Sequence, residues 1–269
     1  MMTRIITQIE RGGMINFHEL FTKETFNCEK HGERLVNVFK GKAPQCNLCA
    51  KEFEEQEKAR LAEKERLQKI EYQKRLIEMR FKSSLIPPRF QQHSFESYIA
   101  KNELQVKNKK AMEDYATNFE ENYKKGSSVI LSGNVGTGKT HLACAVGNYI
   151  IKNLNKTALF LNAIDAFSKV KATYSKKSEI SEIDAINQFA EIDLLILDEF
   201  GVQVGSETEK LILFRIINRR YEYLKPTILI TNLSVAEIKK FEERIFDRLK
   251  DNGILLNFTG ESNRKSKKI

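Results

Sequence analysis

Five short, mostly apolar runs lie in the second half of the chain, at 129–131, 158–161, 194–197, 227–230 and 254–258. Strands that are apolar on both faces are typical of a parallel sheet covered by helices on each side. The stretches between the runs are long enough for helices. The sequence therefore predicts an α/β domain with a five-stranded parallel sheet, from about residue 83 to residue 269.

A different pattern precedes this domain. Residues 51–82 are rich in Glu, Lys and Arg and contain neither Gly nor Pro. Leu67, Ile70 and Ile77 recur at helical spacing, which predicts one long solvated helix with a thin apolar stripe. Pro87-Pro88 ends it. Such a helix serves either as a strut or partner-binding element, or as a charged linker, and the sequence leaves both open.

The strand at 129–131 leads into a glycine-rich loop of the form G-x-x-x-x-G-K-[ST]. Glycines let consecutive backbone N–H groups wrap a phosphate, and the following helix N-terminus adds positive charge. The lysine reaches the β- and γ-phosphates, and the final hydroxyl binds Mg²⁺. We therefore expect nucleoside triphosphate, ATP with Mg²⁺, to be held by Gly133, Asn134, Val135, Gly136, Thr137, Gly138, Lys139 and Thr140.

Acidic and amide side chains follow two later strands. Asp198 and Glu199 come directly after four aliphatic residues, some sixty residues past the loop. This pairing predicts that Asp198 holds Mg²⁺ and that Glu199 polarises the attacking water. Asn232 follows the strand at 227–230, at the sheet edge where ligands of parallel sheets bind. An amide there is a candidate to hold the water or the γ-phosphate.

Arginines near the C-terminus are candidates to stabilise charge that develops on the γ-phosphate. Arg248 lies on a predicted helix, and Arg264 lies in the basic tail. Such an arginine acts either within its own subunit or from a neighbouring one.

Three of the four cysteines lie in the first 50 residues, with a histidine. Cys28 and His31 form one pair, and Cys46 and Cys49 form another, each with two residues inside the pair. Three thiolates and an imidazole suit tetrahedral Zn²⁺ at a closed structural site. We expect a zinc-binding segment over residues 1–50, with the 14 residues between the pairs returning as a hairpin. The fourth cysteine, Cys144, is expected to be a small buried residue.

Composition adds little to this picture. The formal net charge of +9 suits contact with a polyanion, and also suits a basic protein without such a partner. The sequence contains no apolar run long enough to span a bilayer and no secretion signal, so we expect a cytoplasmic protein without membrane contact. Reduced thiols in that compartment favour metal ligation over disulfides.

Taken together, these motifs resemble the DnaC-type helicase loaders of bacteria and phages, which are AAA+ ATPases. The resemblance is carried by the glycine-rich loop with His141-Leu142-Ala143, by Leu-Leu-Ile-Leu-Asp-Glu-Phe-Gly, by Thr-Asn-Leu, by Glu-Arg-Ile-Phe-Asp-Arg-Leu, and by Ile86–Phe90 with Ser94–Tyr98. The N-terminal cysteine-histidine cluster is similar to the zinc-binding head of some members.

This resemblance implies an AAA+ core and specific roles for its residues. Asn232 falls near the first sensor, Arg248 matches an arginine finger that acts across a subunit interface, and Arg264 matches the second sensor. The implied activity is ATP hydrolysis that loads a hexameric replicative helicase onto single-stranded DNA. A finger acting across an interface implies self-association with nucleotide. Only 20 residues follow Leu249, too few for a helical lid domain.

Two further readings stay open at this point. Transposition helper ATPases of the IstB type share nearly all the nucleotide motifs and act on duplex DNA and a transposase. A nucleotide-gated binding module with negligible turnover would also carry these residues.

Overall fold

The computed structural model describes residues 20–175, 177–201 and 206–262. Its internal contacts divide the chain into two units, Met1–Gln73 and Lys74–Ile269. Each unit is described by itself below.

The first unit contains an antiparallel hairpin of β1 (Phe21–Cys28) and β2 (Gly32–Phe39). Its turn lies between Cys28 and His31, because Gly32 adopts a left-handed φ of +71° and lets the chain reverse there. The expectation that the residues between the two ligand pairs form a hairpin of their own is therefore wrong. Those residues supply only the second strand.

Helix α2 (Asn47–Ser83) confirms the predicted solvated helix. None of its residues is buried, and ion pairs of the Glu54–Lys58 type run along its surface. The helix begins four residues earlier than the sequence indicated. As a consequence, Cys49 lies in its first turn.

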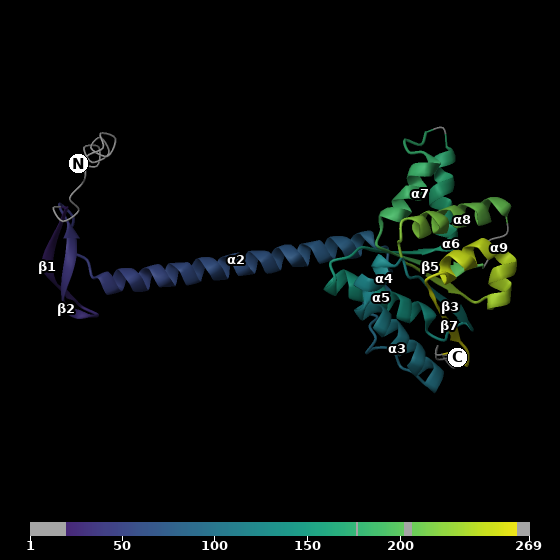
Figure 1. Ribbon diagram of the computed structural model, residues 1–269, viewed down its shortest axis with the longest axis horizontal. Coiled ribbons are helices and arrows are strands. Elements are labelled where there is room, and N and C mark those ends of the chain that lie inside the picture. The colour runs from purple at the N-terminus through teal and green to yellow at the C-terminus, as the bar shows by residue number, and fades with distance from the viewer. Residues whose placement is uncertain (1–19, 176, 202–205, 263–269) are drawn as a thin grey trace, which may run out of the picture. The chain divides into compact units, whose positions relative to one another are not determined.

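The second unit is built on a five-stranded sheet in which each predicted apolar run forms one strand (Figure 1). The strand order is β4-β5-β6-β3-β7, and every neighbouring pair is parallel. The predicted fold is thus confirmed. The strands are β3 (Val129–Gly133), β4 (Ala158–Asn162), β5 (Leu194–Phe200), β6 (Thr227–Thr231) and β7 (Ile254–Phe258).

Helices cover both faces of this sheet (Figure 1). One face carries α3 (Glu103–Thr117), α4 (Phe119–Lys124) and α5 (Lys139–Asn153). The other carries α6 (Ala163–Lys171), α7 (Glu182–Glu191), α8 (Glu207–Glu222) and α9 (Val235–Lys250). Short 3₁₀ turns lie at Pro88–Phe90 and Ala172–Tyr174.

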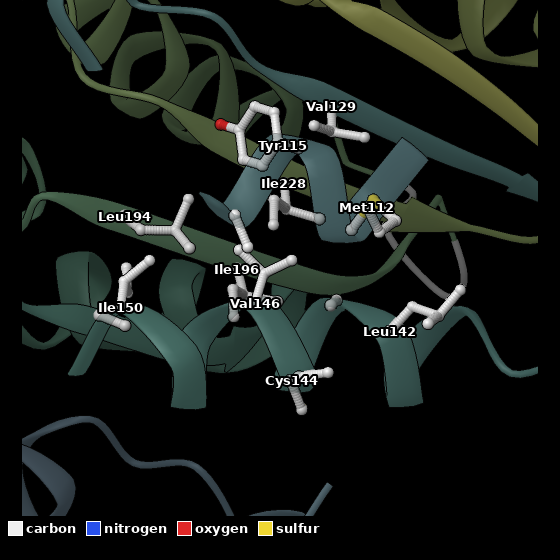
Figure 2. Packing of buried hydrophobic residues seen from close by; sticks show 14 of the residues in the cluster. Met112, Tyr115, Val129, Leu142, Cys144, Val146, Ile150, Leu194, Ile196 and Ile228 are labelled. Carbon is white, nitrogen blue, oxygen red and sulfur yellow. The ribbon is translucent and has the colours of Figure 1, made fainter. Parts of the chain in front are cut away.

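The two faces explain why the strands are apolar at every position. Along β5, Leu194 and Ile196 belong to the core beneath α5, whereas Leu195 and Leu197 belong to the core beneath α8. Figure 2 shows the first of these cores, where Cys144 packs with no exposed surface, as the sequence predicts. Each buried Leu or Ile contributes about 1.5–3 kcal/mol.

Three helices of the second face begin at capping boxes that the sequence encodes. Ser181, Ser206 and Ser234 each accept a bond from the backbone N–H three residues later, and the acidic side chain there bonds back to the serine N–H. This exchange satisfies two of the N–H groups that a helix start leaves without partners. After α9, the described residues, which end at Ser262, form β7 and no lid helix.

Arg220 on α8 is a fully buried charge that joins three elements. Its five N–H donors are all used. They reach the carbonyls of Phe189 and Ile192 at the end of α7, of Asp193 before β5 and of Pro226 before β6, and the hydroxyl of Thr227. Burial lowers the pKa of Arg220 to about 9, so the guanidinium stays charged at neutral pH.

We expect Arg220→Met to lower the free energy of unfolding by about 3 kcal/mol or more, because several buried acceptors lose their donor. The measurement is urea unfolding of the full chain, followed by circular dichroism. Arg219→Met is the matched control, since the Arg219 side chain is 35% exposed, and we expect it to change the unfolding free energy by less than about 1 kcal/mol. Equal effects of the two substitutions would contradict this role.

Candidate nucleotide site and metal cluster

The phosphate loop joins β3 to α5, and two of its positions accept only glycine. Gly133 has φ of +126°, and a Cβ there would lie 2.2 Å from the Phe258 carbonyl oxygen on β7. Gly138 has φ of +95°, and its Cβ would lie 2.4 Å from the Tyr98 ring. A left-handed backbone with so close a neighbour excludes any side chain. The loop can therefore bring its N–H groups to an anion at the start of α5.

Lys139 closes this loop from inside. Its Nζ donates to the carbonyls of Gly133 at 2.6 Å and Asn134 at 2.7 Å, and to Oδ1 of Asn232 at 3.0 Å. Burial lowers the pKa of Lys139 to about 8, and the nearby Asp198 carboxylate opposes that shift. The structure thus places the candidate sensor Asn232 beside the lysine of the loop.

The two acidic residues lie at an irregularity in β5. Register with β6 shifts between Leu197 and Phe200, as in a β-bulge, which re-aims side chains at a strand end. Asp198 accepts from the Thr140 hydroxyl at 2.9 Å, so the two expected Mg²⁺ residues are adjacent. Glu199 has a left-handed φ of +57°, and its N–H donates to Asp198 Oδ1 at 2.7 Å. Such backbone strain in a non-glycine residue clusters at functional sites.

A cavity of about 620 Å³ brings most of these groups together. Its other wall consists of residues that sequence reasoning did not select. The predicted site residues that line the cavity are Val135, Gly136, Gly138, Lys139, Thr140, Asp198, Glu199 and Asn232. The lining residues that were not predicted are Arg89, Phe90, His93, His141, Phe160, Asn162, Ile230 and Thr231.

The missed residues include a row of aromatic rings beside the loop. Tyr98 packs edge-on to His141 at 5.4 Å between centroids, and His141 stacks on His93 at 4.0 Å. Phe90 follows at 5.1 Å and Phe160 at 6.2 Å. The only sign of these residues in the sequence is the stretch Ile86–Phe90 with Ser94–Tyr98, which precedes the α/β core. Tertiary packing, which the sequence does not reveal, brings this stretch against β4 and α5. This segment therefore forms part of the site.

Of the two candidate arginines, only Arg248 lies within the described residues. Arg248 donates to Asn218 Oδ1 at 3.0 Å and lies over the Tyr221 ring at 4.9 Å. It does not line the nucleotide cavity of its own subunit. Arg264 lies outside the described residues.

In the first unit, the four predicted ligands converge. His31 Nδ1 lies 3.7 Å from Cys28 Sγ, 3.5 Å from Cys46 Sγ and 3.3 Å from Cys49 Sγ, and the Cys28 and Cys49 sulfurs are 3.5 Å apart. Ligand atoms around tetrahedral Zn²⁺ stand about 3.5–3.8 Å apart, given Zn–S near 2.3 Å and Zn–N near 2.0 Å. The donor set and its spacing fit zinc.

Electrostatics at the cluster also favour a cation. Backbone N–H groups of His31 and Lys30 lower the pKa of Cys28, and those of Cys49 and Leu48 lower the pKa of Cys46. The hydrogen bond with Cys28, together with burial, raises the pKa of Cys49 to about 11. The turns thus favour two thiolates, and a third beside them requires a compensating positive charge.

Strand order, phosphate loop and acidic pair define a P-loop nucleotide-binding protein with an α/β core. The model of the IstB-like ATP-binding proteins matches residues 50–269, so the chain belongs to the IstB-like ATP-binding family. None of the described helices is both long and apolar enough to cross a membrane.

Relatives of the chain carry more specific names. It is 37% identical over 174 residues to the replicative helicase loader DnaC of Buchnera aphidicola subsp. Baizongia pistaciae, which covers 64% of this chain and 69% of the relative. It is 35% identical over 199 residues to the replicative helicase loader DnaC of Escherichia coli (strain K12), with coverage of 72% and 79%. These relatives support the resemblance seen in the motifs.

A solved structure agrees at the level of fold. The crystal structure of the DnaC helicase loader matches with a TM-score of 0.58 and 23% identity, over 64% of this chain and 99% of that one.

The stacked histidines predict a pH dependence of stability. Burial, with the nearby charges of His141 and Arg89, lowers the pKa of His93 to about 4, and its Nδ1 has no hydrogen-bond partner among the residues that the structure describes. Between pH 6.5 and 4 the unfolded chain binds the proton more readily, so we expect the free energy of unfolding to fall as pH falls through this window. His93→Phe keeps the ring but cannot titrate. Urea unfolding between pH 8 and 4 should show a shallower decline for the variant, and parallel curves would contradict this assignment.

Proposed function

We propose that this protein is an ATPase that loads a replicative helicase onto single-stranded DNA. The observation that carries the proposal is the site at the sheet's carboxyl edge, where Lys139, Thr140, Asp198, Glu199 and Asn232 meet. Family membership supports ATP binding, and the relatives named as replicative helicase loaders support a helicase as the protein that is loaded.

In this proposal, the loop residues hold the phosphates. Lys139 exchanges two backbone carbonyls for phosphate oxygens, and the anion restores the ordinary basicity that burial has reduced. Thr140 and Asp198, which hydrogen-bond to each other, would be the residues that hold Mg²⁺. When bound, Mg²⁺-ATP supplies the γ-phosphate that is attacked and the metal charge that offsets its oxygens.

Glu199 and Asn232 act on the attacking water. The Glu199 carboxylate, which lines the cavity, accepts its proton. Asn232, freed from Lys139 when phosphate binds, orients the water or the γ-phosphate. Arg248 would complete the site of a neighbouring subunit, and Arg264 would act within its own, so hydrolysis requires nucleotide-dependent self-association.

The N-terminal unit would hold zinc through Cys28, His31, Cys46 and Cys49. The described hairpin has few buried apolar residues, so the metal would contribute much of its folding free energy. We assign this unit to recognition of the hexameric helicase, and we assign contact with single-stranded DNA to basic side chains of the ATPase unit. As a helicase loader, the protein would act in the cytoplasm.

A second candidate is an IstB-type transposition helper that acts on duplex DNA and a transposase. The name of the matching family favours it. The names of the relatives favour the loader, and so does the Cys/His cluster, all four residues of which precede the matched range.

We expect Glu199→Gln to lower ATP turnover by about 100-fold or more, because a positioned base contributes about 10²–10⁴ in rate. ATP affinity should stay within a few-fold, since the phosphate contacts are unchanged. Steady-state phosphate release and titration with a fluorescent nucleotide measure the two quantities. Glu207→Gln, on the exposed start of α8, is the control. Negligible turnover in the unaltered protein that does not change in Glu199→Gln would favour the nucleotide-gated module.

To test the proposed interaction with the helicase, the full chain is mixed with the hexameric replicative helicase and a slowly hydrolysed ATP analogue, and we expect a discrete complex. Light scattering after size exclusion gives its mass. The same mixture with residues 74–269 should give no complex, provided that this shorter chain still binds nucleotide. Absence of a complex for the full chain, with clustering on duplex DNA, would favour the transposition helper.

A further inference from the structure

The two ring nitrogens of His31 face different partners. Nδ1 points to the three cysteine sulfurs, whereas Nε2 lies 3.2 Å from Oε1 of Glu52. The His31 side chain is 15% exposed and the Glu52 side chain 39%. A neutral imidazole carries its proton on one nitrogen and a lone pair on the other. A carboxylate at Nε2 holds the proton there and leaves the lone pair on Nδ1.

Glu52 reaches this position because helix α2 begins within the second ligand pair. Cys49 lies in the first turn of α2, and Glu52 comes three residues later on the same face. Cys46 precedes the helix, and its carbonyl accepts from the Ala50 N–H at 3.0 Å. The helix start therefore presents two sulfurs and one carboxylate to the same side, at positions three residues apart.

Lys30 holds the other oxygen of Glu52. Its Nζ donates to Oε2 at 2.5 Å, from the hairpin turn between Cys28 and His31. Glu52 thus accepts two hydrogen bonds from the same turn, one from each of two neighbouring residues. With a metal bound, the ammonium would also offset negative charge, since three thiolates and a carboxylate would surround a single dication.

We propose that Glu52 is an outer positioning residue of the zinc site, a role that rests on the zinc binding proposed above. It accepts the Nε2–H of His31 and fixes the ring with Nδ1 toward the metal, while Lys30 holds the carboxylate in place. Carboxylates that orient ligating histidines in this way typically change metal affinity about 10–100-fold.

Affinity for Zn²⁺ itself tests this role in the full-length protein, by competition with a chromophoric chelator. We expect about one Zn²⁺ per chain for the unaltered protein and a 10–100-fold weaker affinity for Glu52→Ala. Glu52→Gln keeps a neutral acceptor and should lose less. Glu54→Gln is the matched control, because Glu54 lies on the same helix and pairs with Lys58, and it should bind zinc as the unaltered protein does.

A second measurement distinguishes the positioning of His31 by Glu52 from a simple ion pair between Lys30 in the turn and Glu52 in the helix. With ¹⁵N-labelled histidine, we expect His31 to bind metal through Nδ1 and to carry its proton on Nε2. Glu52→Ala should increase exchange of that proton with water, whereas Lys30→Met should leave most of the protection. The absorption spectrum of the Co²⁺ form reports whether the four ligands remain.

Three results would overturn the proposal. Equal zinc affinity of Glu52→Ala and the unaltered protein, or metal binding through Nε2, would remove the role of Glu52 and leave the zinc site standing. Failure of the unaltered protein to bind zinc would remove both. If Glu52→Ala does not fold, Glu52→Gln decides, and an affinity equal to that of Glu54→Gln would count against the role.

Discussion

A buried guanidinium at the amino-terminal ends of β5 and β6 constrains the geometry of the nucleotide site. Arg220 bonds to the chain just before β5 and just before β6, so the entry points of these strands are tied to each other and to the end of α7. Both strands are short and parallel, and their opposite ends carry Asp198 and Asn232. The relative placement of these two side chains follows from the anchor at the other end of their strands. The positive charge also suits α7, whose final carbonyls form the negative end of the helix dipole.

The phosphate loop is organised around its own lysine. Lys139 bonds to two carbonyls of the loop and to Asn232. The bond to Asn232 links the loop after β3 to the residue that follows β6. Arrival of a phosphate must break these bonds and replace them, so occupancy of the loop and the orientation of Asn232 change together. Tyr98, whose hydroxyl donates to the Thr137 carbonyl, ties the segment before the core to the same loop. The aromatic row therefore lies where a change in loop shape would reach it.

Local patterns predicted most of the fold and the chemical groups of the site. The five apolar runs, the phosphate loop, the acidic pair and the ligand pairs are each encoded within a few residues, and the structure brings the members of each together. What the sequence could not supply depends on tertiary packing or on one element boundary. Arg219 and Arg220 look alike in the sequence, and only packing decides which is buried. Glu52 looked like one more charge on a solvated helix, because its role requires α2 to begin at Asn47 rather than near residue 51.

The bulge at the end of β5 has a consequence for how this site can vary. Glu199 occupies a left-handed backbone that costs a side-chain-bearing residue roughly 1–2 kcal/mol and costs glycine little. Glycine or asparagine would therefore fit position 199 with less strain, yet neither supplies a carboxylate to the cavity. With Glu199 as the proposed base, selection for a more stable fold and selection for hydrolysis would act in opposite directions at this residue. A descendant of this chain that no longer needed turnover would be free to relax there while keeping its phosphate loop intact.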